Sequence, residues 1–132
     1  GVNLDSFEME IAGYDLVVTF NGACFDMPFI RRTFPSISLP PAHVDLRFLL
    51  AQIGYRGGLK NIERACGIGR ERDIEDVDGL EAVRLWHAHL RGSESALEKL
   101  VRYNRADIVN LEPLMTKAFR EMRRKILPVC AW

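Results

Sequence analysis

Asp26 is the first residue whose type and place in the sequence suit chemistry. It follows an apolar run at residues 15–20 and the pair Asn21 and Gly22, which breaks that run. The run predicts a buried strand of the parallel-sheet type, so Asp26 falls in the first turn of the helix that comes next. Open α/β sheets bind their ligands at this end of a strand. The alternative is an aspartate that only favours the positive end of the helix dipole.

Tyr103 and Asp107 form the second candidate pair. They are four residues apart in a helical pattern and therefore adjacent on one face. We expect them at the edge of a buried stripe, where a tyrosine hydroxyl beside a carboxylate can orient a water held by a metal. The alternative is a boundary pair that only packs. The predicted stripe consists of Leu97, Leu100, Val101, Asn104, Ile108 and Leu111.

The elements that must position these residues are mostly helical. Besides the strand at 15–20, a short extended piece is expected at 43–45. Helices are expected at 4–12, 25–32, 46–53, 59–66 and 80–90, followed by a long helix from 93 that Pro113 kinks or restarts. Residues 70–78 are charged and predicted to be irregular. The helix at 80–90 is predicted to turn Leu80, Val83, Trp86 and Leu90 inward.

These elements indicate an α/β fold with one or two strands. A single strand cannot satisfy its own backbone groups. We therefore expect further strands upstream of the 132 residues, or from a second copy of the chain in a homo-oligomer.

Composition narrows the class only slightly. The 132 residues suit one domain, and 48% hydrophobic with 27% charged residues is ordinary for a globular protein. Lysine plus arginine equals aspartate plus glutamate at 18 each, so net charge does not decide for or against nucleic acid. Three cysteines without metal-ligand spacing argue against a disulfide framework and a zinc site. No membrane span or signal peptide is evident, so a cytoplasmic location is expected.

Together the two candidate motifs resemble a known family. Asn21 with Phe25–Asp26 after a strand, and Tyr103 with Asp107 on a helix about 80 residues later, are similar to the second and third motifs of the DEDDy 3′–5′ exonucleases, which are ribonuclease H-like. The connecting segments that begin at Gly58, Asp78 and Tyr103 resemble the YprB-type subfamily. The similarity runs from about residue 14 to residue 114, which is most of the chain.

The resemblance implies a two-metal phosphodiesterase acting on single-stranded 3′ ends of DNA or RNA. Four carboxylates would hold two Mg²⁺ or Mn²⁺ ions about 3.5–4 Å apart. Asp26 and Asp107 would be metal ligands and Tyr103 would orient the attacking water. Phe25 would shape the pocket around the terminal nucleotide, and Asn21 would position the strand end. Arg120, Arg123, Arg124 and Lys125 could meet phosphates or could simply be a solvated helix end.

The chain departs from the family pattern at the first motif. The Asp-x-Glu pair that supplies the other two carboxylates should precede Asp26 by several tens of residues. Asp73 and Glu75 have the right spacing but no strand before them, and are predicted to be a solvated loop. We therefore expect residues 1–132 to be one partial ribonuclease H-like domain, inactive alone, whose intact form is an exonuclease. The alternative is a non-catalytic module on the same fold that binds nucleic acid or protein. For either, we predict Asp26 and Asp107 facing one another within about 8 Å across a cleft.

Overall fold

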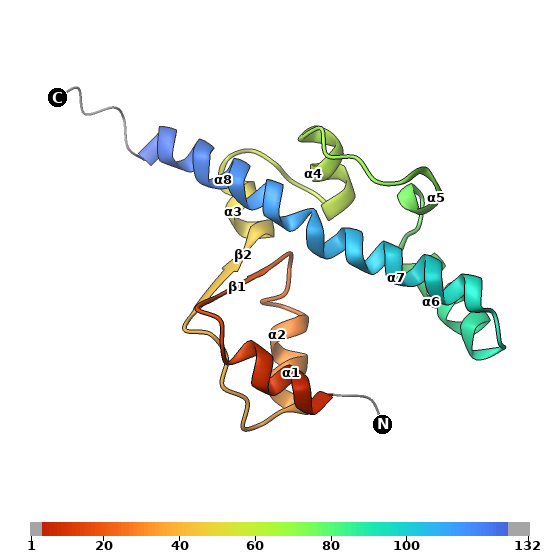
Figure 1. Ribbon diagram of the computed structural model, residues 1–132. Helices are drawn as coiled ribbons and strands as arrows, with labels where there is room; N and C mark the ends of the chain where they lie inside the picture. Colours follow the sequence, from red (N-terminus) through yellow and green to blue (C-terminus); the bar gives the residue numbers. More distant parts are fainter. Residues whose placement is uncertain (1–3, 127–132) are drawn as a thin grey trace.

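The computed structural model describes residues 4–126. A long rod of two nearly collinear helices, α7 (Glu94–Val109) and α8 (Leu111–Ile126), runs across the molecule (Figure 1). One lobe lies below the rod in this view and contains α1 (Leu4–Ile11), α2 (Asp26–Thr33) and the two strands of the sheet. The helices α4 (Leu59–Ala65) and α5 (Arg72–Glu75) lie on the other side of the rod in this view.

The two strands, β1 (Leu16–Thr19) and β2 (Ala42–Asp45), are parallel, with Val17 opposite His43 and Thr19 opposite Asp45. Their connection passes through α2, because parallel neighbours need a crossover. The parallel arrangement predicted for the apolar run is confirmed. Its burial is not, because Leu16 is 41% exposed and the rest of β1 is only partly buried in this two-stranded sheet.

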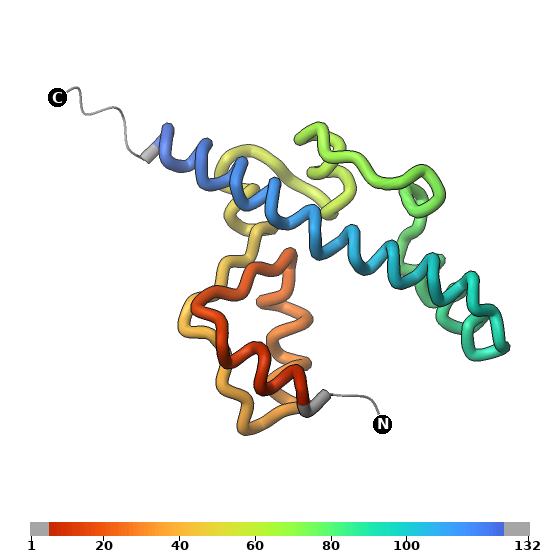
Figure 2. The backbone as a smooth tube through the Cα atoms, viewed as in Figure 1, coloured from red at the N-terminus to blue at the C-terminus, as the bar shows by residue number. Residues whose placement is uncertain are grey.

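The core lies where α3 (Leu46–Gln52), α4 and α8 meet next to the strands (Figure 2). A Leu and Ile cluster fills it, and Ala118 lets α8 approach α3 closely. Asp45 caps α3 by accepting a hydrogen bond from the backbone N–H of Arg47. The fully or nearly buried side chains of the cluster are Leu46, Leu50, Ile53, Ile62, Leu114 and Ala118.

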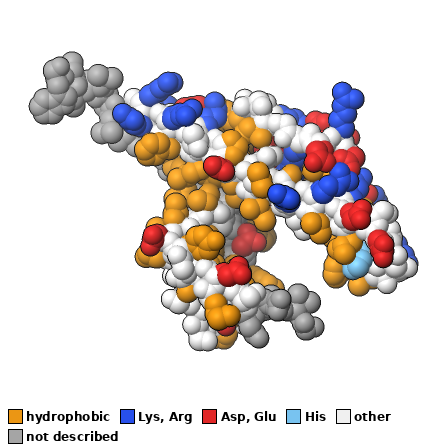
Figure 3. Space-filling view, in the orientation of Figure 1, with side chains coloured by type: hydrophobic (Ala, Val, Ile, Leu, Met, Phe, Trp, Pro, Cys, Tyr) orange, Lys and Arg blue, Asp and Glu red, His pale blue; other side chains and the backbone are white. Residues whose placement is uncertain are grey.

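The helix α6 (Gly79–Leu90) and the start of α7 form an antiparallel hairpin, the arm that ends the rod on the right of Figure 2. Asp78 caps α6 and Ser93 caps α7. The prediction for the inner face of α6 is wrong. Leu80, Val83, Trp86 and Leu90 are each 46–62% exposed, and orange side chains gather on this arm in Figure 3. The face with Ala82 and Leu85 is the less exposed one.

Most predicted boundaries are confirmed to within one or two residues. The long helix does restart near Pro113, since α7 ends at Val109 and α8 begins at Leu111. The charged stretch at 70–78 contains a helical turn, α5, that was not predicted. The loop predicted for Asp73 and Glu75 is therefore wrong, although both residues are exposed as predicted. Ile74 between them is 2% exposed, and Asp73 pairs with Arg102 of α7.

Two cysteines, Cys24 and Cys66, are free thiols, and Cys130 lies outside the described residues. Burial raises the pKa of the Cys66 thiol. None of the helices between residues 4 and 126 is both long enough and apolar enough to cross a membrane.

Candidate active site

One carboxylate at the end of β2, that of Asp45, binds the loop that follows β1. Asp45 accepts hydrogen bonds from the backbone N–H groups of Asn21 at 2.7 Å and Ala23 at 3.0 Å. Asn21 has a φ of 64°, in the left-handed region that asparagine tolerates better than most residues. Asp45 therefore fixes the turn through which the chain leaves β1 for α2. The same carboxylate caps α3, so Asp45 holds both the start of that helix and this loop.

Gly22 allows the same loop to close tightly. A Cβ atom at this position would lie 2.5 Å from the Thr19 Cβ, whereas one at Gly79 would meet nothing within 4 Å. We expect Gly22→Ala to lower the free energy of unfolding by about 1–3 kcal/mol, because a buried site with no room must shift its neighbours. Urea denaturation measures this, with Gly79→Ala as the control. Equal stability of the two variants would contradict the close packing at Thr19.

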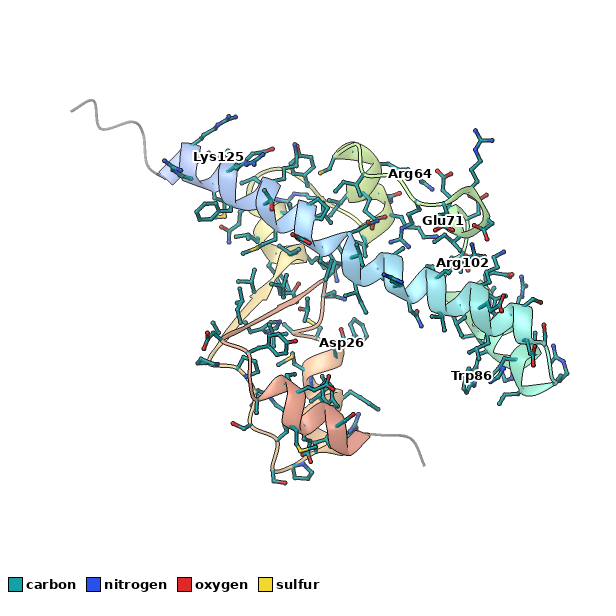
Figure 4. All side chains as sticks on the ribbon, in the orientation of Figure 1. Asp26, Arg64, Glu71, Trp86, Arg102 and Lys125 are labelled. Carbon is teal, nitrogen blue, oxygen red and sulfur yellow. The ribbon has the colours of Figure 1, made fainter. Side chains whose placement is uncertain are left out.

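Asp26 is the first residue of α2, as the sequence predicts, and it is exposed. It lies at the end of α2 nearer to the rod (Figure 4). Phe25, just before it, is 68% exposed, and no side chain caps the helix there. Asn21 is half-buried, and its side-chain oxygen Oδ1 is buried without a hydrogen-bond partner in the described part of the chain. These three residues thus follow one another around the end of β1, with Phe25 and Asp26 accessible.

Tyr103 and Asp107 lie on α7, on the side that faces α4 and α5. The predicted core stripe is wrong at three of its six positions, since Val101 is 55% and Ile108 69% exposed, and Asn104 is exposed. The other three, Leu97, Leu100 and Leu111, are half-buried. Tyr103 is half-buried too, and the Asp107 side chain is 33% exposed. Their predicted adjacency on one face is confirmed, because both lie on α7 one turn apart and Arg70 contacts both. Burial first, and then the charge of Asp107 and a hydrogen bond to it, raise the pKa of Tyr103.

A buried arginine holds Asp107. The Arg70 Nη2 atom lies 2.6 Å from Asp107 Oδ1, and its side chain is 2% exposed. Its other partner is Glu63 of α4, also 2% exposed, which accepts from Arg70 Nε at 2.7 Å and from Nη2 at 2.8 Å. Asn110 Nδ2 donates to the same carboxylate at 3.1 Å. Although burial opposes the charge, the hydrogen bonds and charges of Glu63 and Asp107 raise the pKa of Arg70, which remains a cation.

Two cations lie close to the Tyr103 ring. The Arg70 guanidinium carbon is 5.6 Å and the Lys60 Nζ atom 5.4 Å from its centroid, both within cation–π range. Lys60 in turn donates hydrogen bonds to the backbone oxygens of Glu75, at 2.9 Å, and Val77. Burial and then the charge of Arg70 lower the pKa of Lys60. The tyrosine is thereby fixed between α4, the α5 region and its own helix.

The structure brings Tyr103 and Asp107 together but does not join them to Asp26. Within residues 4–126 no hydrogen bond or ion pair links Asp26 to either of them. The separation of about 8 Å predicted for the two carboxylates stays a prediction. The end of α2 that carries Asp26 is turned toward the rod (Figure 4), which is the orientation the prediction requires.

The donor chemistry fits a divalent metal, but the number of donors does not make a complete site. Asp26 and Asp107 offer hard oxygens of the kind that Mg²⁺ and Mn²⁺ prefer. In the described chain no group of three or more histidine, cysteine, aspartate or glutamate side chains is placed to hold a metal ion. Asp107 also has Oδ1 in contact with Arg70. A metal bound by these residues alone would therefore need further ligands.

Comparison with protein families decides the class of the domain. A model described as the RNase_H superfamily matches residues 2–119, which include both motifs. The chain belongs to the RNase H superfamily. The two parallel strands with their helical crossover are consistent with that α/β fold, as predicted. Membership points to nuclease activity in general terms. Searches of curated proteins and of solved structures returned no match.

Reasoning from sequence missed Glu63 and Arg70, the buried centre of this candidate site. A signal for Glu63 was present. The spacing of Leu59, Ile62 and Cys66 makes position 63 part of the buried face of α4, so a glutamate there requires a buried partner. Arg70 gave no comparable signal, because it begins a stretch dense in charged residues.

Proposed function

We propose that this chain is part of a metal-dependent 3′–5′ exonuclease of the DEDDy kind, similar to the YprB-type subfamily. The observation that supports it best is the placement of Tyr103 against Asp107 on one face of α7, in a chain that matches the RNase H superfamily. A tyrosine and an aspartate one helical turn apart are the residues that this class needs there. The proposal assigns phosphodiester hydrolysis at the 3′ ends of single-stranded DNA or RNA.

The roles divide between the two ends of the site. Asp26 and Asp107 would hold Mg²⁺ or Mn²⁺, which supplies an activated water and stabilises the leaving oxygen. The Tyr103 hydroxyl, beside Asp107, would orient the nucleophile by a hydrogen bond. The exposed Phe25 ring suits stacking on the terminal base, and Asn21 suits contact with the strand end. The proposal requires an Asp-x-Glu pair from outside these 132 residues.

Exposed basic side chains near the end of α8 offer charge for a nucleic-acid backbone. Blue side chains cluster there in Figure 3, and Lys125 is labelled in Figure 4. Contacts of this kind neutralise phosphates without reading sequence, so the substrate strand would be bound through its backbone. The residues concerned are Arg120, Arg123, Arg124 and Lys125.

One observation favours a non-catalytic binding module instead. Arg70 contacts Asp107 directly, and a cation at a carboxylate competes with a metal for its charge. The Asp107 side chain is nevertheless 33% exposed, so a ligand can still reach it. For this reason we rank the exonuclease first and treat the binding module as the second candidate.

The test compares the product of the whole gene with the 132-residue chain. Each is incubated with 5′-labelled single-stranded DNA and RNA in the presence of Mn²⁺. We expect the whole-gene product to shorten the strand from its 3′ end one nucleotide at a time, and the 132-residue chain to leave it intact, since two carboxylates cannot hold a two-metal site.

Two other outcomes decide against this assignment. Binding of the strand by the whole-gene product without any cleavage in Mg²⁺ or Mn²⁺ would favour the binding module. Degradation by the 132-residue chain itself, abolished by Asp26→Ala, would show that the remaining ligands lie within this chain and have been assigned wrongly.

A further inference from the structure

We infer that Arg70 is a positioning residue that sets the orientation of the Asp107 carboxylate beside Tyr103. The inference rests on the proposed function for its catalytic consequence. Arg70 sits between the α4 helix and α7, and it touches both residues of the Tyr103–Asp107 pair from one buried position. Nothing in the mechanism proposed above uses it.

Contacts with Glu63 fix the Arg70 guanidinium group independently of Asp107. Its Nε and Nη2 atoms grip both oxygens of Glu63, a planar two-point contact that allows one orientation. Asn110 Nδ2 also donates a hydrogen bond to Glu63 Oε1, which restrains the Glu63 carboxylate as well. Rotating the arginine away would leave Glu63 as an uncompensated buried charge. Arg70 is therefore a rigid support, and Asp107 is the partner that adapts to it.

Asp107 meets this support through its Oδ1 atom. Oδ1 lies 2.6 Å from Arg70 Nη2, and a third of the side chain is exposed. This contact restricts the rotation of the carboxylate, which remains accessible to a ligand. Partners that orient a metal-binding carboxylate in this way normally change metal affinity or activity by about 10–100-fold when they are replaced.

Stability alone does not account for this arginine. Buried ion pairs are often no more stabilising than apolar side chains of the same volume. Arg70 also carries a cost, since its Nη1 atom is buried with no hydrogen-bond partner among residues 4–126. A buried donor without a partner calls for an explanation other than packing. A role in orienting Asp107 and contacting the Tyr103 ring provides one.

The experiment first measures the Asp107 side chain in the 132-residue chain by NMR, without metal. The three-bond couplings of its carboxyl carbon report χ1. We expect Asp107 to adopt one rotamer in the unsubstituted chain and to average between rotamers when Arg70 is replaced. The replacement is Arg70→Lys or Arg70→Gln, chosen as the variant that keeps a native amide spectrum. Arg102→Lys is the matched control. Arg102 lies on α7, the helix that carries Asp107, and like Arg70 it pairs with two acidic residues, but its side chain is 45% exposed. The control variant should leave the Asp107 couplings unchanged.

The second measurement uses Mn²⁺ binding to the whole-gene product, followed by the EPR signal of free Mn²⁺. Arg70→Lys keeps the competing cation but loses the planar two-point contact, so it should raise the dissociation constant about 10–100-fold, and Arg102→Lys should change it less than twofold.

Each remaining outcome is decisive. Averaged couplings in the unsubstituted chain, or a single Asp107 rotamer that persists without Arg70, would overturn the inference. Averaging with unchanged Mn²⁺ affinity would reduce Arg70 to a structural residue. If the unsubstituted whole-gene product neither binds Mn²⁺ nor cleaves the strand, the proposed function is wrong. The NMR result would still decide whether Arg70 orients Asp107.

Discussion

Removing the charge of Asp26 or Asp107 in the whole-gene product is expected to lower the rate of 3′-end hydrolysis by roughly 10³-fold or more, because each would be a direct ligand of a catalytic metal. Asp26→Ala suits the first position, since Asp26 is exposed and has no ion-pair partner in the described part of the chain. Asp107→Asn suits the second, because it keeps an acceptor for Arg70 and removes only the charge. Initial rates on labelled single-stranded substrate at saturating Mn²⁺ measure the effect.

A graded series makes this prediction specific. Tyr103→Phe removes one orienting hydrogen bond and keeps both the ring and its contacts with Lys60 and Arg70, so a loss of only about 10–10³-fold is expected. Asp15→Ala is the control, since Asp15 is exposed and lies at the opposite end of β1. The mapping fails if Asp26→Ala behaves like Asp15→Ala. A harmless Tyr103→Phe would mean that the tyrosine only packs.

Local signals in the sequence sufficed for most of the fold. The boundaries of α3 and α4 follow from the spacing of their apolar residues. Gly67, with a φ of 73°, lies just after α4 in the left-handed conformation that commonly terminates a helix. The apolar run before Asn21 gave the first strand, and the Asp26 position follows directly from it. These features depend on residues near one another in the chain, so pattern reasoning can find them.

The orientation of the amphipathic helices could not be predicted. The α6 helix has large apolar side chains on one face and Ala82 and Leu85 on another, and periodicity gives no rule for choosing between them. In the α6–α7 hairpin the face with Ala82 and Leu85 is the less exposed one, and Trp86 remains 46% exposed. The same uncertainty affected α7, where Ile108 was expected inside and Asp107 at the edge.

The electrostatic centre of the candidate site depends on contacts between distant segments. Glu63 and Asn110 are 47 residues apart, and the sequence contains no pattern that pairs them. Arg70 was one charged residue among many until the fold buried it. The sequence could therefore name the two residues that suit catalysis on α7, but not the group that holds them.

Removing Glu63 should be the most damaging single change to folding. Glu63→Ala would leave the Arg70 guanidinium buried with Asp107 as its one acidic partner, and breaking a buried pair in this way costs about 3–5 kcal/mol of the free energy of unfolding. Urea denaturation of the 132-residue chain measures it. Glu71→Ala is the matched control, because Glu71 is 65% exposed and its pair with Arg102 is at the surface, where the expected loss is about 1 kcal/mol or less.

A double variant separates the stability of this centre from its role in the site. Glu63→Leu combined with Arg70→Met replaces the ion pair by apolar side chains and should recover most of the stability lost in Glu63→Ala, since such exchanges are often neutral. The double variant would then fold with Asp107 unsupported, so its Mn²⁺ affinity in the whole-gene product should stay about 10–100-fold weaker. A Glu63→Ala variant as stable as Glu71→Ala would contradict the burial of the pair. Restored stability together with normal Mn²⁺ affinity would instead assign Arg70 to folding alone.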